Sequence, residues 1–221
     1  MPDPVLQQVE HFSNPGMTAN DSFKPVTKYF DRITRPEQII QSLPQAIQTM
    51  LDPADSGPAC LSLCQDVQGE TFDYPEEFFK ERIHNIRRPK PDDFQIKQAM
   101  EKIKKSKKPI IISGGGVFYS DAMDELGSFA IKHNIPVTQT VMGYSTMKRD
   151  HSHFLGPIGG LGGRAANNLA KETDLAICVG TKLADFTTGS WANFENPEFK
   201  LVSINIARHD ANKHLAEAVI G

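Results

Sequence analysis

Unbroken apolar runs, rather than alternating apolar and polar positions, distinguish the second half of this 221-residue chain. Such runs are typical of strands that are covered on both faces, as in a parallel sheet. Between the runs, apolar residues recur at helical spacing. The pattern predicts strands over 109–113, 136–140, 174–180 and 200–206, and helices over 92–106, 121–133 and 163–171. This alternation predicts an α/β fold, a Rossmann-like parallel sheet covered by helices.

The first part of the chain supplies fewer elements. Residues 1–34 show no sustained period and are predicted to be irregular. A helix is predicted over 35–51, with a kink or break at Pro44, and a strand over 57–64. One helix and one strand are too few for an independent core. These residues are therefore predicted to form an incomplete α/β segment, the tail of a domain whose beginning is missing.

The stretch 74–92 is rich in charge and proline and has no strong period, which favours a linker. The predicted organisation is therefore a first part over 1–73, this linker, and an α/β domain over 93–221.

The net charge and composition of the chain limit which partners and which cell compartment can be expected. A net charge of −3 gives no reason to expect a nucleic acid or an anionic membrane as partner. No run of residues approaches the roughly 20 apolar positions of a membrane span. Three cysteines, odd in number and embedded in apolar runs, do not form the framework of a disulfide-rich secreted protein, so the sequence predicts a cytoplasmic location.

Three glycines follow the predicted strand 109–113. Gly114, Gly115 and Gly116 stand between that strand and a predicted helix. Glycines here let the main chain approach a ligand closely, as in many nucleotide-binding domains, or they simply permit a tight turn. The motif alone leaves both interpretations open.

A second glycine-rich segment, 160–165, matches the dinucleotide fingerprint in its variant with a final alanine, and Asp185 lies about twenty residues on. That fingerprint requires a preceding strand, and 154–158 is a poor strand candidate. A glycine loop that lets a helix start close to another group is the favoured alternative to NAD binding.

The sequence contains only weak signals of a metal site or of a catalytic nucleophile. His151 and His153 have the spacing of paired ligands, but no nearby cysteine or acidic cluster completes a zinc set, so solvated loop histidines and no metal are predicted. Neither Ser113 nor Ser190 lies in a nucleophile elbow. No catalytic residue is predicted.

Lys182 and Asp185 follow the predicted strand 174–180. Ligands of open α/β sheets bind at the carboxyl ends of the strands, so these two side chains are candidates for contact with a substrate. Structural capping is an equally good explanation of each.

Several motifs together resemble one enzyme family. They are Arg35-Pro36, Gly57-Pro58 with Asp66-Val67, the run 108–116, Ile135-Pro136-Val137, Met142-Gly143, the run 174–180 and Ile204-Asn205-Ile206. Taken together they resemble the thiamine-diphosphate-dependent enzymes of the acetolactate synthase type. Further motifs at 20–28, 66–70, 74–75 and 179–187 are most similar to a hydrolase branch of that superfamily, which opens a trihydroxylated cyclohexanedione ring in myo-inositol catabolism.

The resemblance implies that 1–73 is the end of a pyrimidine-binding domain and that 93–221 is a middle domain. It also implies thiamine diphosphate and Mg²⁺ as cofactors of the parent enzyme, whose binding elements lie outside this chain, and a small-molecule substrate whose C–C bond is cleaved. The chain alone is then expected to be an inactive fragment that needs the other domains and assembles as a homo-oligomer.

In some relatives the middle domain holds FAD or ADP. By motif matching, the resemblance implies that this site would here be lined by Gly114, Gly115, Gly116, Met142, Gly143, Gly180 and Thr181. Asn205 departs from the acidic residue often found at its strand end, which argues against a nucleotide. Two other functions remain open: a non-catalytic module that binds an adenine nucleotide, and a fragment of an acetolactate synthase-like carboligase.

Overall fold

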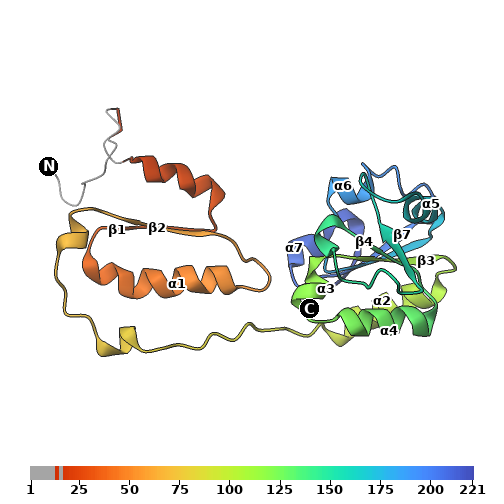
Figure 1. Cartoon of the computed structure of the whole chain (residues 1–221), viewed down its shortest axis with the longest axis horizontal. Helices are drawn as coiled ribbons and strands as arrows, with labels where there is room; N and C mark the ends of the chain where they lie inside the picture. The colour runs from red at the N-terminus through yellow and green to blue at the C-terminus, as the bar shows by residue number, and fades with distance from the viewer. Residues whose placement is uncertain (1–12, 15–16) are drawn as a thin grey trace. The chain divides into compact units, whose positions relative to one another are not determined.

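The computed structural model describes residues 13–14 and 17–221. The chain forms two compact units, Met1–Arg87 and Arg88–Gly221 (Figure 1). The boundary between them lies inside the predicted linker, and the domain bounds at 73 and 93 stay predictions.

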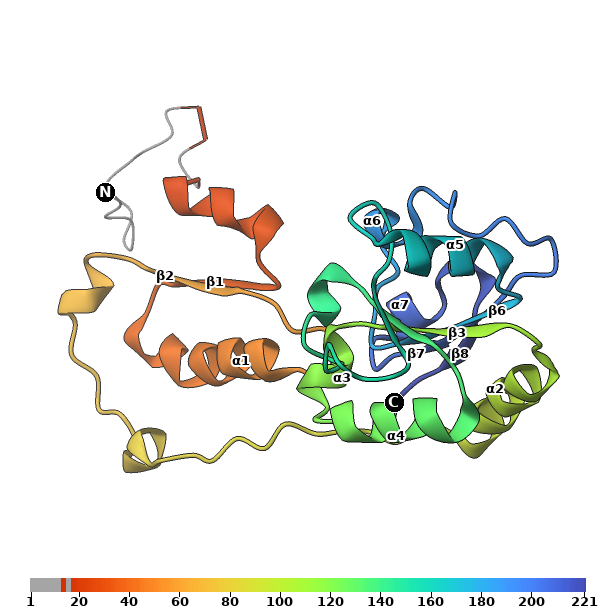
Figure 2. The same cartoon turned by 45° about the vertical axis from the view of Figure 1, so that its right-hand side comes forward.

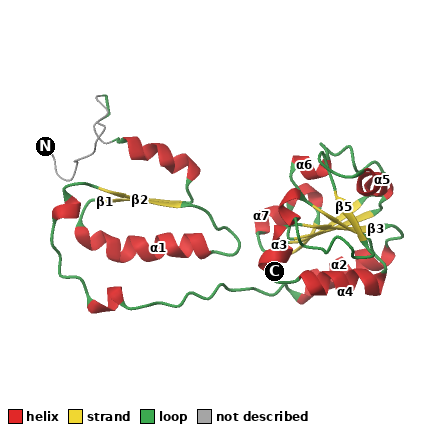
Figure 3. Ribbon diagram, in the orientation of Figure 1, coloured by secondary structure: helices red, strands yellow, loops and turns green. Residues whose placement is uncertain are grey.

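The first unit holds a parallel strand pair with one helix. Strand β1 (Tyr29–Ile33) pairs in parallel with β2 (Ala59–Leu63), and helix α1 (Ile39–Leu51) connects them (Figure 3). Ile33, Cys64 and Val67 form the small buried core. Helices of the 3₁₀ type cover Ala19–Val26, Pro36–Gln38, Val67–Gly69 and Glu76–Phe79.

Two sequence predictions for this unit are wrong. Residues 19–26 and 29–33 are not irregular, because they form a 3₁₀ helix and β1. For residues 1–12 and 15–16 the prediction of irregular structure lies outside the described residues. The hydrophobic pattern did not predict β1, because the strand carries the charged residues Asp31 and Arg32. These side chains bind residues of other elements; Asp31, for example, accepts a hydrogen bond from Ser42 of α1. Helix α1 is also not broken at Pro44 but continues through it, so the predicted break is wrong, while a kink at Pro44 stays a prediction.

The second unit is built on one sheet of six parallel strands, in the order β5-β4-β3-β6-β7-β8. The strands are β3 (Pro109–Ser113), β4 (Val137–Gln139), β5 (Phe154–Pro157), β6 (Leu175–Val179), β7 (Lys200–Ile204) and β8 (Glu217–Val219). The helices are α2 (Asp93–Lys105), α3 (Gly115–Tyr119), α4 (Met123–His133), α5 (Arg164–Glu172), α6 (Asp185–Thr188) and α7 (Arg208–Ala211). Short 3₁₀ turns cover Val141–Gly143 and Lys213–Leu215.

Helices cover both faces of the sheet. Ile111 and Ile177 pack with residues of α2 and α4 on one face. Ile110 and Cys178 pack with Ala166 and other residues of α5 on the opposite face (Figure 2). The unbroken apolar runs are thus explained by burial on both sides, and the predicted Rossmann-like α/β class is confirmed.

Two edge strands and one helix differ from the sequence prediction. Residues 154–157 do form a strand, β5, although Gly156 and Pro157 make it a poor candidate. It lies at the edge of the sheet and pairs with β4, with a shift in register. Strand β8 has three residues at the other edge and was not predicted. The short helix α3 precedes α4, where one helix from 121 was expected.

Asp174 ties the amino ends of β3 and β6 together. It accepts hydrogen bonds from the Ser106 hydroxyl and from the main-chain N–H groups of Lys107 (2.7 Å) and Lys108 (3.1 Å). Burial would raise the pKa of Asp174, but these hydrogen bonds outweigh it and the pKa is lowered.

No helix in residues 13–14 and 17–221 is long and apolar enough to cross a membrane.

The strand order has a functional consequence. Numbered from β3, it is 3-2-1-4-5-6, the order of the dinucleotide-binding fold. The order reverses between β3 and β6, and ligands of such sheets bind where their carboxyl ends meet.

Candidate functional site

The glycines of the β3–α3 turn lie at this reversal point. The main-chain N–H of Gly114 donates to the carbonyl oxygen of Val179 at 2.8 Å, and that of Gly116 donates to Gly180 at 2.9 Å. The turn after β3 is therefore bonded to the end of β6.

The contact between these segments leaves no room for side chains. A Cβ atom on Gly114 would lie 2.3 Å from the carbonyl oxygen of Gly180, and one on Gly116 would lie 2.6 Å from its Cα. Gly180 has φ of +60°, in the left-handed region. The glycines thus allow two main-chain segments to pack on each other, as the tight-turn interpretation requires.

Met142 and Gly143 complete this packing from β4. A Cβ on Gly143 would lie 2.3 Å from the carbonyl oxygen of Ser113, and one on Gly115 would lie 3.0 Å from that of Met142. The Met142 side chain itself is 77% exposed. Gly114, Gly116, Gly143 and Gly180 are called the glycine junction below.

A buried pair of hydroxyl groups lies beneath the glycine junction. The Ser113 hydroxyl lies 2.7 Å from that of Thr146, which donates to the carbonyl oxygen of Gly143 at 2.7 Å. Ser113 also donates to the carbonyl oxygen of Thr138 at 3.0 Å. These bonds fix the 3₁₀ turn after β4 against β3, and they account for Ser113 without a nucleophilic role.

Thr181 and Asn205 extend the connection to β7. The Asn205 amide donates to the carbonyl oxygen of Thr181 at 3.0 Å and accepts from the N–H of Ala207 at 2.9 Å. The Thr181 hydroxyl accepts from the N–H of Leu183 at 3.2 Å. The structure thus brings the seven predicted cofactor-binding residues together, but it uses their polar groups largely within the protein.

Lys182 and Asp185 are both exposed at the same end of the sheet. Asp185 is the first residue of α6 and accepts a hydrogen bond from the Ser190 hydroxyl at 3.2 Å. This bond agrees with the structural explanation of Asp185, and contact with a substrate stays a prediction for both residues.

The second glycine segment is also bonded internally. The N–H groups of Gly160, Gly162 and Gly163 donate to the carbonyl oxygens of Phe186 (2.7 Å), Gly159 (2.8 Å) and Pro157 (2.9 Å). Main-chain N–H groups that hold a phosphate must point out of the loop. These three do not, so the match to the dinucleotide fingerprint is one of sequence only.

The paired histidines are held in the loop before β5. Nε2 of His153 lies 3.0 Å from the Asn134 side chain, and Nδ1 of His151 accepts from the N–H of His153 at 3.2 Å. Within the described ranges, no group of three or more His, Cys, Asp or Glu residues is placed to hold a metal ion.

Cys178 lies in β6 close to the glycine junction. Its side chain is 1% exposed, and burial raises the pKa of the thiol to about 12. A thiol that stays protonated is not a nucleophile.

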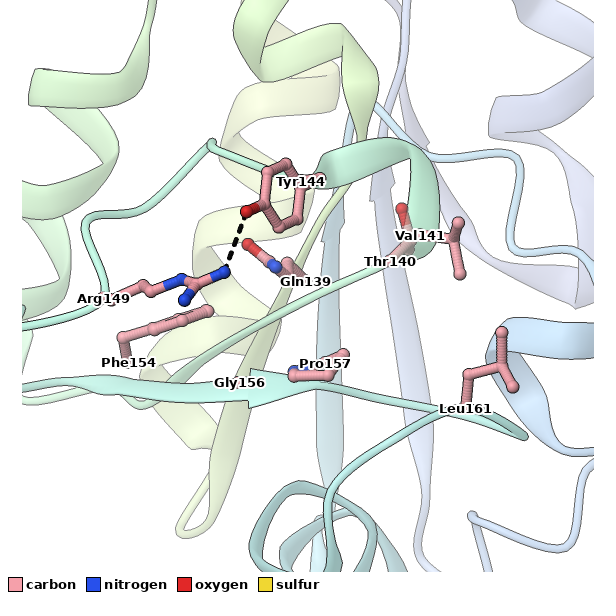
Figure 4. Close-up of a pocket in the computed structure, with 9 residues that line it drawn as sticks. All are labelled: Gln139, Thr140, Val141, Tyr144, Arg149, Phe154, Gly156, Pro157 and Leu161. Carbon is pink, nitrogen blue, oxygen red and sulfur yellow. Dashed lines mark hydrogen bonds between the residues drawn. The ribbon is translucent and has the colours of Figure 1, made fainter.

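A cavity of about 670 Å³ opens beside the glycine junction, at the carboxyl end of β4 and along β5 (Figure 4). Gln139, Tyr144 and Arg149 supply polar groups to it, and sequence reasoning did not single out any of them. None of the three had a signal in the sequence, since Gln139 stands between the polar residues Thr138 and Thr140, and Tyr144 and Arg149 come from a loop without a pattern.

The second unit is therefore a six-stranded parallel α/β domain with dinucleotide-fold strand order and a closed glycine junction at its reversal point. Residues 96–221 match the family described as thiamine pyrophosphate enzyme, central domain. Since this match covers more than half of the chain, the chain belongs to the thiamine pyrophosphate enzyme family.

Curated relatives extend the similarity to the first unit. The chain is 49% identical over 220 residues to a 3D-(3,5/4)-trihydroxycyclohexane-1,2-dione hydrolase of Clostridium perfringens, covering all of this chain and 34% of the relative. It is 50% identical over 212 residues to the enzyme of the same name from Clostridium botulinum, covering 96% of this chain and 33% of the relative. The chain thus spans about a third of the length of these relatives.

Among solved structures, benzoylformate decarboxylase from Polynucleobacter necessarius has a TM-score of 0.70 at 20% identity, covering 90% of this chain and 36% of that one. At this identity the likeness concerns the fold alone.

Proposed function

We propose that this chain is part of a thiamine-diphosphate-dependent hydrolase that cleaves a C–C bond of trihydroxycyclohexane-1,2-dione, the ring-opening step in myo-inositol catabolism. The observation that carries the proposal is the 49% identity along the whole chain to a relative of that name. In this proposal, 1–73 is the end of the pyrimidine-binding domain and 93–221 is the middle domain.

The described residues do not fit the cofactor by themselves. Thiamine diphosphate is held through a Mg²⁺ ion, which requires a set of oxygen ligands, and residues 13–14 and 17–221 present no group of three or more acidic or histidine side chains that could hold a metal. We therefore derive no catalytic step from this chain and expect it to be inactive alone.

A chimaera tests the proposal. The 220-residue segment of the Clostridium perfringens hydrolase that aligns with this chain is replaced by the chain, and dione ring opening is measured with thiamine diphosphate and Mg²⁺. We expect the chimaera to be active and the isolated chain to be inactive. The control chimaera carries the corresponding segment of the benzoylformate decarboxylase, whose fold is similar but whose sequence is only 20% identical.

The same chimaera distinguishes the carboligase alternative. A folded chimaera that has lost ring opening but joins two pyruvate molecules would favour an acetolactate synthase-like parent. A folded chimaera with neither activity would contradict the proposed function, because the segment would then not support the chemistry of its relatives.

Nucleotide binding is the other alternative. The glycine junction argues against it, because the N–H groups of Gly114 and Gly116 already donate to Val179 and Gly180 and are not available to a phosphate. We expect no change in thermal unfolding of the chain with ADP, FAD or NAD. A ligand present at about 100 times its dissociation constant would stabilise the chain by about 2.7 kcal/mol, which such a measurement detects.

We also propose that the protein is cytoplasmic and assembles as a homo-oligomer. The thiols of Cys60 and Cys178, which form no disulfide, support a reducing compartment. The assembly state is tested by light scattering on the active chimaera.

A further inference from the structure

The cavity beside β4 has an apolar wall and a polar end. Val141, Phe154, Pro157 and Leu161 supply the apolar wall. Gln139, Tyr144 and Arg149 supply the polar end (Figure 4). A cavity of several hundred Å³ with this division is typical of a site for a small organic molecule.

Gln139 is a buried polar residue in the lining of this cavity. It is the last residue of β4 and is 7% exposed, and its main-chain carbonyl already accepts from the N–H of Ile158 at 3.0 Å. Its side-chain Oε1 is buried and has no hydrogen-bond partner. Buried amide oxygens are normally paired, because leaving one unpaired is unfavourable. Gln139 therefore presents an acceptor that lacks a donor.

Arg149 is held at the mouth of the cavity by Tyr144. Its Nη2 donates to the Tyr144 hydroxyl at 2.8 Å, and its Cζ lies 5.9 Å from the centre of the Tyr144 ring. Among the described residues, no carboxylate forms an ion pair with it. The guanidinium group keeps N–H groups for a second partner, and its planar fork matches a carboxylate.

The Gln139 amide is directed towards the Tyr144–Arg149 pair in Figure 4. A ligand that meets both groups needs an anionic end for Arg149 and, close to it, an O–H or N–H donor for Gln139. Its remaining body must be apolar, since it lies against Phe154 and the residues beyond it.

We propose that this cavity binds an organic carboxylate that has an apolar, preferably aromatic, body and a hydroxyl or N–H group next to the carboxylate. Arg149 binds the carboxylate, Gln139 accepts the neighbouring hydrogen bond, and the apolar wall holds the body. This site is independent of the proposed hydrolase function and uses none of the residues of the glycine junction.

The test uses four probes that differ by one group each. They are 3-phenyllactate, 3-phenylpropionate without the hydroxyl, 3-phenylpropane-1,2-diol without the carboxylate, and lactate without the ring. Each is titrated into the ¹⁵N-labelled 221-residue chain, and dissociation constants come from the amide shifts of residues 139–161. We expect phenyllactate to bind with a dissociation constant of about 1 mM or below, and each of the other probes at least about tenfold more weakly.

Variants connect this pattern to the named residues. Arg149→Gln should weaken the binding of phenyllactate at least about tenfold and leave the affinity for the diol unchanged. Lys148→Gln is the matched control, because it removes a neighbouring exposed charge that does not line the cavity. Gln139→Leu should abolish the preference for phenyllactate over phenylpropionate.

Three results would overturn the proposal. They are no saturable shift up to about 20 mM phenyllactate, equal affinity in Arg149→Gln, or equal affinity for phenyllactate and phenylpropionate in the unsubstituted chain. If Gln139→Leu fails to fold, the comparison of these two acids still tests the role of Gln139.

Discussion

Gly116 and Gly180 are in direct main-chain contact. The N–H of Gly116 donates to the carbonyl oxygen of Gly180 at 2.9 Å, and a Cβ atom on Gly116 would lie 2.6 Å from the Cα of Gly180. Two segments 64 positions apart in the sequence therefore meet with no side chain between them, at the point where the strand order reverses.

Gly116→Ala should destabilise the second unit. The added methyl group forces the two main-chain segments apart, and overpacking of this kind costs about 1–3 kcal/mol. Urea unfolding followed by the fluorescence of Trp191 measures the change. Gly163→Ala is the control, because a Cβ there has no atom within 4 Å, and a loss as large as that of Gly116→Ala would contradict the packing explanation.

Asp174→Asn should destabilise the same unit by about 2 kcal/mol at pH 7, because its hydrogen bonds join the starts of β3 and β6. Since the pKa of Asp174 is lowered by folding, its contribution is present above the unfolded value near 3.8 and is lost as the pH falls below it. The free energy of unfolding should therefore change more between pH 7 and pH 3 for the unsubstituted chain than for the variant.

Glu172→Gln is the matched control for Asp174→Asn. Glu172 forms one exposed ion pair with Lys108 at 2.9 Å, and such pairs contribute little. A control variant as unstable as Asp174→Asn would show that the loss of a charge, rather than the loss of the Asp174 hydrogen bonds, causes the destabilisation.

Asp21 should make the first unit sensitive to acid. The Lys24 ammonium group is the largest cause that holds the pKa of Asp21 at about 2, with the Thr18 N–H and the Arg32 guanidinium adding to it against the effect of burial. The carboxylate therefore stabilises the folded unit above pH 3.8, and this contribution is lost as the pH falls from about 4 towards 2.

Asp21→Asn should remove that loss, as measured by amide hydrogen exchange of β1 and β2 at several pH values. The comparison variant is Asp55→Asn, whose carboxyl side chain is 76% exposed and pairs with Lys28. The assignment fails if Asp55→Asn removes the acid sensitivity equally well.

Cys178 should resist alkylation in the folded chain. Its pKa of about 12 leaves almost no thiolate at pH 8, and its side chain is buried. Peptide mass spectrometry after iodoacetamide treatment should find Cys60, which is partly exposed, labelled before Cys178. Labelling of Cys178 at the rate of Cys60 without denaturant would show that β6 opens locally.

The central strands could be predicted from the sequence because burial on both faces imposes an unbroken apolar run. The predicted strand 109–113 has the bounds of β3. Strands β1 and β8 could not be predicted in this way. The first carries Asp31 and Arg32, whose partners Ser42 and Asp21 lie on other elements, and the second is a three-residue edge strand. The local pattern of apolar and polar residues gives no information about such partners.

The glycine motifs predicted where the site lies but not how it is used. Gly114 and Gly180 are found together because parallel strands bring their carboxyl ends to one edge. Whether a glycine faces a ligand or another main-chain segment depends on distances in the folded chain, which the spacing of residues in the sequence does not give. Gln139 and Arg149 were missed for the same reason, since their common cavity arises only when β4 and β5 pair.

The hydrogen bonds from Gly116 to Gly180 and from Asn205 to Thr181 also have a mechanical consequence. The loops that follow β3, β6 and β7 are bonded to one another rather than suspended separately from the sheet. Displacing any one of these loops would therefore strain its hydrogen bonds to a neighbouring loop, so we expect the three to respond to a load as one unit.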